Sequence, residues 1–206
     1  MQPAFPLFDL LKAEAGWQHT SSTFVDAGPH VQVEHAKFTT PTRSAPVTWT
    51  IVNRKAAVAI APMLEDGRLV LIAQERIPVR HTMWEFPAGQ IDGPYDQVTH
   101  QNVIDTALNE LREETGCELA EDGKLEPLGW YFPSAGFTQE IVYLFLAKTV
   151  RIVQEPKPVG SEQINGIRKV TLDELLAMID CNEVTASVCH AMAAKLCAKQ
   201  GQGFLP

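Results

Sequence analysis

The chain of 206 residues has little positive charge and no long apolar run. It carries 17 Lys and Arg against 25 Asp and Glu, which gives a formal net charge of −8. Extended nucleic acids and anionic membranes are bound through clustered basic side chains, so this balance argues against both classes of partner. The longest strongly apolar run, residues 141–147, is far shorter than the roughly 20 residues of a membrane-spanning helix. We therefore expect neither a nucleic-acid partner nor a membrane.

The sequence also lacks signals of export and of transition-metal binding. Its first residues contain no basic region and no small-residue cleavage site, so we expect a cytoplasmic protein. The four cysteines, at positions 117, 181, 189 and 197, and the six histidines show no paired metal-ligand spacing. Reduced, mostly buried thiols are therefore expected. With 45% hydrophobic and 20% charged residues, the composition is that of a folded globular protein.

The apolar pattern predicts strands first and then a mixture of strands and helices. Strands are predicted at residues 31–38, 47–52, 56–64, 68–75 and 141–148. The third and fourth of these flank an Asp-Gly turn, which is typical of a hairpin. A boundary near Arg54 divides the chain into a β subdomain, residues 1–54, and a mixed α/β core, residues 55–206.

Three segments have the spacing of helices. Apolar residues recur at helical intervals in residues 102–115, and Gly116 follows at the position of a C-cap. Residues 171–179 begin with a capping box of Thr171 and Glu174, and residues 185–199 carry a long helical pattern.

The first predicted helix has an acidic end. Glu110, Glu113 and Glu114 lie within one helical turn, where each pair of like charges costs about 0.2–0.5 kcal/mol. Arg112 is a single cation that points away from Glu110 and Glu114 on a helical wheel. A hard divalent cation such as Mg²⁺ is the natural partner of such carboxylates. The alternative is a solvated acidic face, and the charge pattern alone does not decide between them.

The surrounding residues resemble a known family. Residues 109–117 read NELREETGC and resemble the second half of the Nudix box. Residues 84–93 read WEFPAGQIDG and resemble the loop that opens this box, with Gly89 as its leading glycine. Residues 49–54, 74–79 and 131–137, followed by Glu140, resemble the ADP-ribose (ADP-sugar) pyrophosphatase branch. Pro133 lies 16 residues after Cys117, where that branch has its marker proline.

The resemblance implies a Nudix α/β/α sandwich with a mixed sheet, a small N-terminal antiparallel β subdomain and a homodimer. It also implies hydrolysis of the diphosphate of ADP-ribose, or of a related nucleoside diphosphate sugar, with Mg²⁺ or alternatively Mn²⁺. The implied products are AMP and a sugar phosphate, which is ribose 5-phosphate for ADP-ribose.

The family's functional residues can be carried over position by position. The implied metal ligands are the carboxylates of Glu110, Glu113 and Glu114 and the main-chain carbonyl of Ala88. The implied general base is Glu162. The implied substrate contacts are Arg76 and Glu85, near the diphosphate and terminal ribose, and Trp49 and Arg54, at the adenosine end and commonly supplied by the partner subunit.

Two departures from the family pattern concern the box. Asn109 replaces its arginine, and the spacing from Gly89 to Asn109 is six residues longer than the pattern. The first box glutamate falls at Tyr95 or Gln101, depending on the end from which the spacing is counted. Both members of the family's supporting Glu–Arg pair are therefore neutral, as expected if they were exchanged together.

Alternatives remain at the level of function and of single residues. The chain could be a Nudix-fold module that binds a nucleotide sugar without cleaving it, a hydrolase of another nucleoside diphosphate derivative, or a structural α/β domain with an acidic helix. Trp49 could be a half-buried packing residue, Arg76 could pair with Glu75 or Glu85, and Glu162 could be a solvated loop carboxylate.

Overall fold

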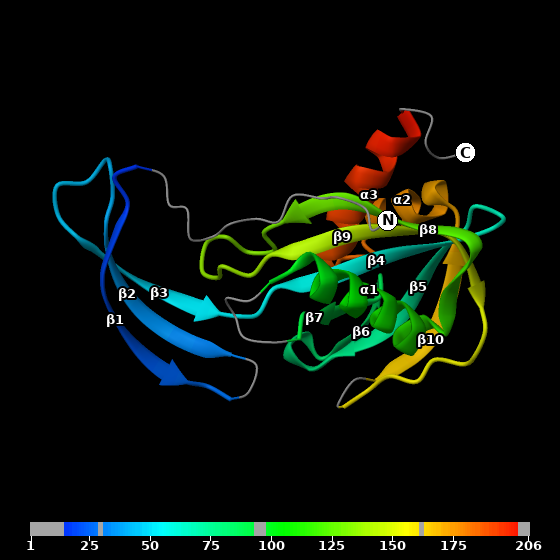
Figure 1. Ribbon diagram of the computed structural model, residues 1–206, viewed down its shortest axis with the longest axis horizontal. Helices are drawn as coiled ribbons and strands as arrows, with labels where there is room; N and C mark the ends of the chain where they lie inside the picture. Colours follow the sequence, from blue (N-terminus) through cyan, green and yellow to red (C-terminus); the bar gives the residue numbers. More distant parts are fainter. Residues whose placement is uncertain (1–14, 29–30, 93–97, 161–162, 202–206) are drawn as a thin grey trace.

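The computed structural model describes residues 15–28, 31–92, 98–160 and 163–201 (Figure 1). They form a three-stranded sheet, a seven-stranded sheet and helices that cover the larger sheet. The strands are β1 (Gln18–Asp26), β2 (Gln32–Thr39), β3 (Val47–Asn53), β4 (Ala57–Leu64), β5 (Leu69–Arg76), β6 (His81–Glu85), β7 (Ala88–Gln90), β8 (Cys117–Tyr131), β9 (Val142–Ile152) and β10 (Ile164–Val170). The helices are η1 (Ile77–Val79), α1 (His100–Thr115), α2 (Leu172–Asp180) and α3 (Ser187–Gly201).

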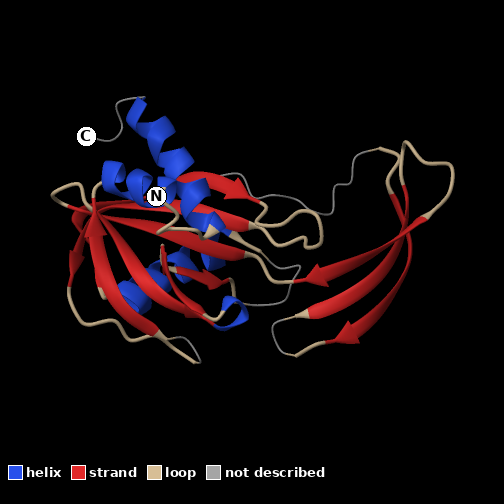
Figure 2. Cartoon of the chain, turned by 180° about the vertical axis from the view of Figure 1, so that it is seen from behind, coloured by secondary structure: helices blue, strands red, loops and turns tan. Residues whose placement is uncertain are grey.

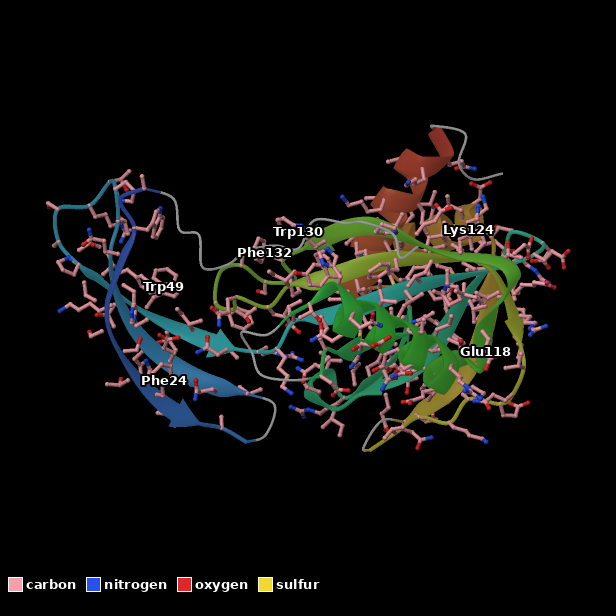
Figure 3. The ribbon with its side chains drawn as sticks, viewed as in Figure 1. Phe24, Trp49, Glu118, Lys124, Trp130 and Phe132 are labelled. Atoms are coloured by element: carbon pink, nitrogen blue, oxygen red, sulfur yellow. The ribbon has the colours of Figure 1, made fainter. Side chains whose placement is uncertain are left out.

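The first three strands form a separate antiparallel sheet in the order β1-β2-β3, which we call the outer sheet. It projects from one end of the rest of the molecule (Figure 1). Of its described residues, only Ala36 and Asn53 are buried, and Phe24 and Trp49 are more than half exposed (Figure 3). The outer sheet therefore has almost no interior of its own.

The larger sheet has the order β10-β5-β4-β9-β8, with β6 paired to β5 and β7 paired to β4. It is mixed, because β4 and β9 are parallel whereas the other pairs are antiparallel. Side chains of β4 alternate between its two faces. Ala59 packs in a cluster with α2 and α3, whereas Ile60 packs in a second cluster with α1. The helices thus lie on opposite faces (Figure 2), and the predicted α/β/α sandwich is confirmed.

Most of the predicted elements are present. The helix predicted at 102–115 is α1, which ends at Gly116 in the left-handed conformation with φ 68°. Thr171 and Glu174 form the predicted capping box of α2. The prediction omitted β1, β6, β7, β8 and β10. In the part of the chain that the structure describes, no helix is long and apolar enough to cross a bilayer.

The four cysteines are free thiols, as predicted. Cys117 and Cys189 are buried, and Cys197 is half-buried on α3. The prediction of burial is wrong for Cys181, because this residue caps the C-terminus of α2 and is exposed.

Candidate active site

Helix α1 presents two carboxylates to the sheet because they continue its apolar stripe. Val103, Ala107 and Leu111 are buried in the cluster beneath the helix. Residues four apart differ by only about 40° around a helix axis, so Glu110 and Glu114 face the same way as this stripe. Glu114 is only 2% exposed.

Strand β7 lies directly against these two carboxylates. The main-chain N–H of Ala88 donates to Glu114 Oε2 at 2.7 Å. A Cβ atom at Gly89 would overlap Oε1 and Cδ of Glu110 and would lie 2.8 Å from its Cγ, so only glycine leaves room for this side chain. Gly89 is held in place by its pairing with Val58 on β4. We call the two carboxylates and the backbone of residues 88–89 the acidic cradle.

The third predicted carboxylate, Glu113, lies to the side of the acidic cradle. It is about 100° around the helix from Glu114 and is half-buried. Its main-chain carbonyl accepts the N–H of Lys157 at 2.7 Å. Across the described ranges, no three His, Cys, Asp or Glu side chains converge closely enough to hold a metal ion. The structure therefore brings Glu110 and Glu114 to Ala88, and the joining of Glu113 to them stays a prediction.

The chemistry of the acidic cradle fits a hard divalent cation. Carboxylate and carbonyl oxygens are the ligands that Mg²⁺ and Mn²⁺ prefer. A buried carboxylate such as Glu114 is costly unless it is paired, and two carboxylates that face the same way repel each other. The nearby Arg112 is exposed and pairs with Glu118 at 3.2 Å. A bound cation would offset both costs.

Arg76 and Glu85 bind each other next to the acidic cradle. The Arg76 guanidinium donates to Glu85 through Nε at 3.0 Å and through Nη2 at 2.7 Å. The Glu85 side chain is 5% exposed, whereas that of Arg76 is 41% exposed. Strand β6 ends at Glu85, and the chain reaches Ala88 through the buried residues 86–87. Pairing of Arg76 with Glu85 was one of the sequence-based alternatives, and it leaves a fixed guanidinium accessible to an anion.

Trp49 and Arg54 lie apart from this group. Figure 3 shows Trp49 on the outer sheet, well away from α1. Its indole N–H donates to the carbonyl of Gly136 at 3.0 Å, and its side chain points to solvent over much of its surface. Arg54 Nε lies 3.5 Å from Glu140 Oε1. The two predicted adenosine contacts are therefore held by one loop, residues 134–140, and not by the acidic cradle.

Glu162 falls outside the described residues. The residue after it, Gln163, accepts the main-chain N–H of Glu75 at 3.0 Å through its carbonyl. Strand β10 then begins beside β5, with Ile164 opposite Gln74. The chain that follows Glu162 thus runs along the strand that ends at Arg76.

One buried charged residue, Glu140, received no role from the sequence. Its side chain is 10% exposed, and burial raises the pKa of its carboxyl group although the nearby Arg54 lowers it. The sequence signals for this residue are its place in the match to the ADP-ribose pyrophosphatase branch and its position directly before the apolar run 141–147.

Comparisons with known proteins agree with this geometry. The NUDIX domain model matches residues 53–187. An ADP-ribose pyrophosphatase of Bacillus subtilis is 31% identical over 134 residues, 65% of this chain and 68% of its own. A methanol dehydrogenase activator of Bacillus methanolicus is 31% identical over 63% of this chain and 65% of its own. An ADP-ribose pyrophosphatase of Mycobacterium tuberculosis is 33% identical over 54% and 50%.

The fold has a close match among solved structures. The crystal structure of an ADP compounds hydrolase aligns with 94% of this chain and with 100% of its own, at a TM-score of 0.73 and 18% identity. Because it covers 94% of the chain, this likeness includes most of the outer sheet as well as the core. Enzymes of the Nudix family generally use divalent metal ions, in agreement with the oxygen donors of the acidic cradle. The chain belongs to the Nudix family.

Proposed function

We propose that this protein hydrolyses the diphosphate of ADP-ribose, or of a related nucleoside diphosphate sugar, to AMP and a sugar phosphate. The observation that carries the proposal is the acidic cradle beside the Arg76–Glu85 pair. It combines a site suited to cations with a guanidinium held for a phosphate oxygen. The relatives named ADP-ribose pyrophosphatases support ADP-ribose as the first substrate to test.

The metal site we propose consists of Glu110, Glu113, Glu114 and the carbonyl of Ala88, with Mg²⁺ as the ion and Mn²⁺ as a substitute. When bound, such an ion neutralises diphosphate oxygens and lowers the pKa of a bound water. The protein supplies the rest. The Ala88 N–H fixes the carboxylate of Glu114, so that its orientation does not depend on the ion.

The reaction also needs a general base and a cationic side chain that binds a phosphate oxygen. A water oxygen forms a new bond to phosphorus, and the bond from that phosphorus to the bridging oxygen breaks. We propose that Glu162 is the general base, which accepts the proton that the water loses. The Arg76 guanidinium neutralises charge on a phosphate oxygen while Glu85 fixes its plane, a geometry that suits planar recognition of phosphate.

The adenosine end of the substrate is assigned to Trp49 and Arg54, with Trp49 supplied by a second subunit of a homodimer. Ten residues, mostly in extended strands, separate Trp49 from Ala59, which pairs with Ala88. At about 3.3 Å per residue this separation is on the order of 30 Å, longer than one nucleoside diphosphate sugar. The apolar side chains of Trp17, which precedes β1, and of Phe24 and Val25 on β1 are exposed and are available to such a partner. We therefore treat residues 1–54 as a dimerisation and adenosine-binding subdomain and residues 55–206 as the hydrolase domain of a cytoplasmic enzyme.

The central experiment measures AMP release from ADP-ribose with and without Mg²⁺, followed by a panel of other nucleoside diphosphate sugars and dinucleotides. Glu113→Gln and Glu114→Gln should abolish turnover without unfolding the protein, since each removes a charge but little volume. Glu118→Gln is the matched control, because Glu118 lies beyond the end of α1 and its carboxylate pairs with Arg112. Full activity in Glu114→Gln would contradict the metal site. Tight binding of ADP-ribose without any AMP release would instead favour a binding module.

The dimer can be tested by mixing two inactive variants. A Trp49→Ala subunit keeps its acidic cradle, and a Glu114→Gln subunit keeps its tryptophan. If Trp49 acts on the partner's site, the mixed dimer regains one complete site and a fraction of the activity. If Trp49 acts within its own chain, mixing restores nothing, and that result would contradict the proposed arrangement.

A further inference from the structure

A loop of the core, residues 134–140, contacts the outer sheet, and we call it the junction loop. The main-chain N–H of Val52 donates to the carbonyl of Phe137 at 2.7 Å, and Val52 forms an isolated parallel bridge with Thr138. One residue earlier in the loop, the carbonyl of Gly136 accepts the indole N–H of Trp49 at 3.0 Å. The junction loop therefore fixes both the backbone of β3 and the edge of the Trp49 ring.

Glu140 ends the junction loop and holds the first residue after β3. Its carboxylate lies 3.5 Å from Arg54 Nε, and its main-chain N–H donates to Thr138 Oγ1 at 3.1 Å. The two side chains differ in exposure: that of Glu140 is 10% exposed, and that of Arg54 is 42% exposed. The buried carboxylate thus fixes the base of an arginine whose outer face is open to solvent.

The charge of Glu140 is placed at the edge of the core, where its partner is Arg54. Burial raises the pKa of this carboxyl group despite the nearby Arg54, so its surroundings disfavour the ionised form. A neutral side chain of the same shape would pack at the edge of the core with a smaller desolvation penalty. A nearly buried carboxylate that holds the base of a half-exposed arginine leaves the outer face of this arginine in a fixed orientation, which suits a role in binding.

We propose that Glu140 is a positioning residue, which holds the Arg54 guanidinium on the junction loop so that this arginine is already oriented when the nucleotide binds. The inference rests on the proposed function, in which Arg54 contacts the adenosine end of the substrate. An arginine that must be ordered on binding weakens affinity by roughly 3- to 10-fold, because its rotamer freedom is lost at that step. Glu140 removes this loss in advance.

The test is the change Glu140→Gln, which keeps the volume and removes the charge. We expect the KM for ADP-ribose to rise about 3- to 10-fold, with kcat within about twofold of the wild-type value. Glu140→Asp keeps the charge and should recover part of the loss. In an Arg54→Ala background, Glu140→Gln should have no further effect, since the residue on which it acts is gone.

Glu183→Gln is the matched control, because it breaks the Arg168–Glu183 ion pair on a remote surface and should leave KM unchanged. The Kd of AMP, measured by calorimetry, gives a second measure that does not need hydrolysis. If the wild-type protein binds AMP but releases none from any nucleotide sugar, the proposed function fails while this comparison still tests Glu140. A KM and a Kd within twofold of wild type in Glu140→Gln, or effects that add to those of Arg54→Ala, would overturn the inference.

Discussion

Gly89→Ala tests the acidic cradle while leaving every charge in the protein. A methyl group at this position would overlap Oε1 and Cδ of Glu110, so the carboxylate must turn away from Ala88. The obstacle is the end of a flexible side chain and not backbone, and Gly89 is outside the left-handed region of φ. Helix α1 and strand β7 can therefore keep their places while one carboxylate leaves the cradle.

The expected magnitudes separate activity from stability. Moving Glu110 off its preferred rotamer costs about 0.5–1.5 kcal/mol. Replacing glycine by alanine in a compatible conformation stabilises by about 0.4–1 kcal/mol through the unfolded chain. The free energy of unfolding should therefore change by less than about 1 kcal/mol, or about 4 °C in Tm. Misplacing a group that supports a metal ion costs about 10- to 100-fold in metal affinity or activity. We expect that loss in kcat/KM at a fixed Mg²⁺ concentration.

The assay is AMP release from ADP-ribose over a Mg²⁺ titration, with a thermal melt of each variant. Higher Mg²⁺ should restore part of the activity of Gly89→Ala. Two other glycines serve as controls. Gly116→Ala places a Cβ against the main-chain carbonyl of Gln154 at φ 68° and should lower stability by more than about 2 kcal/mol. Gly166→Ala meets nothing within 4 Å and should change neither property. Wild-type kcat/KM in Gly89→Ala, or a stability loss like that of Gly116→Ala, would refute the reasoning.

Three further predictions concern buried groups. Arg76→Met leaves the carboxylate of Glu85 without its guanidinium and should lower the free energy of unfolding by about 2 kcal/mol in urea titrations, less than for a fully buried pair because Arg76 is 41% exposed. Burial raises the pKa of Glu140, so ionisation of this carboxyl group opposes folding. The stability that comes from its protonated form is fully present below pH 4.5, the ordinary pKa of the group, and is lost as the pH rises through the pKa in the folded protein. Glu140→Gln should accordingly be more stable than wild type at pH 7, and chemical denaturation at pH 4 and 7 should show the difference shrinking in acid. Burial raises the pKa of the Cys189 thiol to about 12, so mass spectrometry after iodoacetamide treatment of the native protein should find Cys181 alkylated and Cys189 intact.

The strands that the sequence did not predict show where pattern reasoning stops. β8 and β10 are the two ends of the strand order in the larger sheet. An edge strand can contain a proline and can change register at bulges, and β8 contains Pro127 and two register shifts. Its alternation of apolar residues is therefore broken. The central strands β4 and β9 are buried on both faces, so their continuous apolar runs were visible in the sequence.

The candidate site was predictable in its residues but not in its grouping. Helical spacing alone places Glu110 and Glu114 on one face, and the box resemblance points to Gly89. The ion pairs of Arg76 with Glu85 and of Arg54 with Glu140 depend on how distant segments meet, which no local pattern reports. The same limit applies to Glu113, whose position relative to the cradle depends on side-chain orientation at the end of α1.

The outer sheet has almost no interior of its own, and this affects how the protein behaves on dilution. Of the described residues in these three strands only Ala36 and Asn53 are buried, so the strands cannot fold by themselves. Their order must come from the junction loop and, in the homodimer that we propose, from the second subunit. If the proposed dimer forms, amides of β1 and β2 should lose protection from hydrogen exchange as the protein is diluted below the dissociation constant of that dimer, while those of β4 and β9 keep theirs. Since Trp49 lies on this sheet, activity per subunit should fall over the same range, which makes the enzyme's output depend on its own concentration.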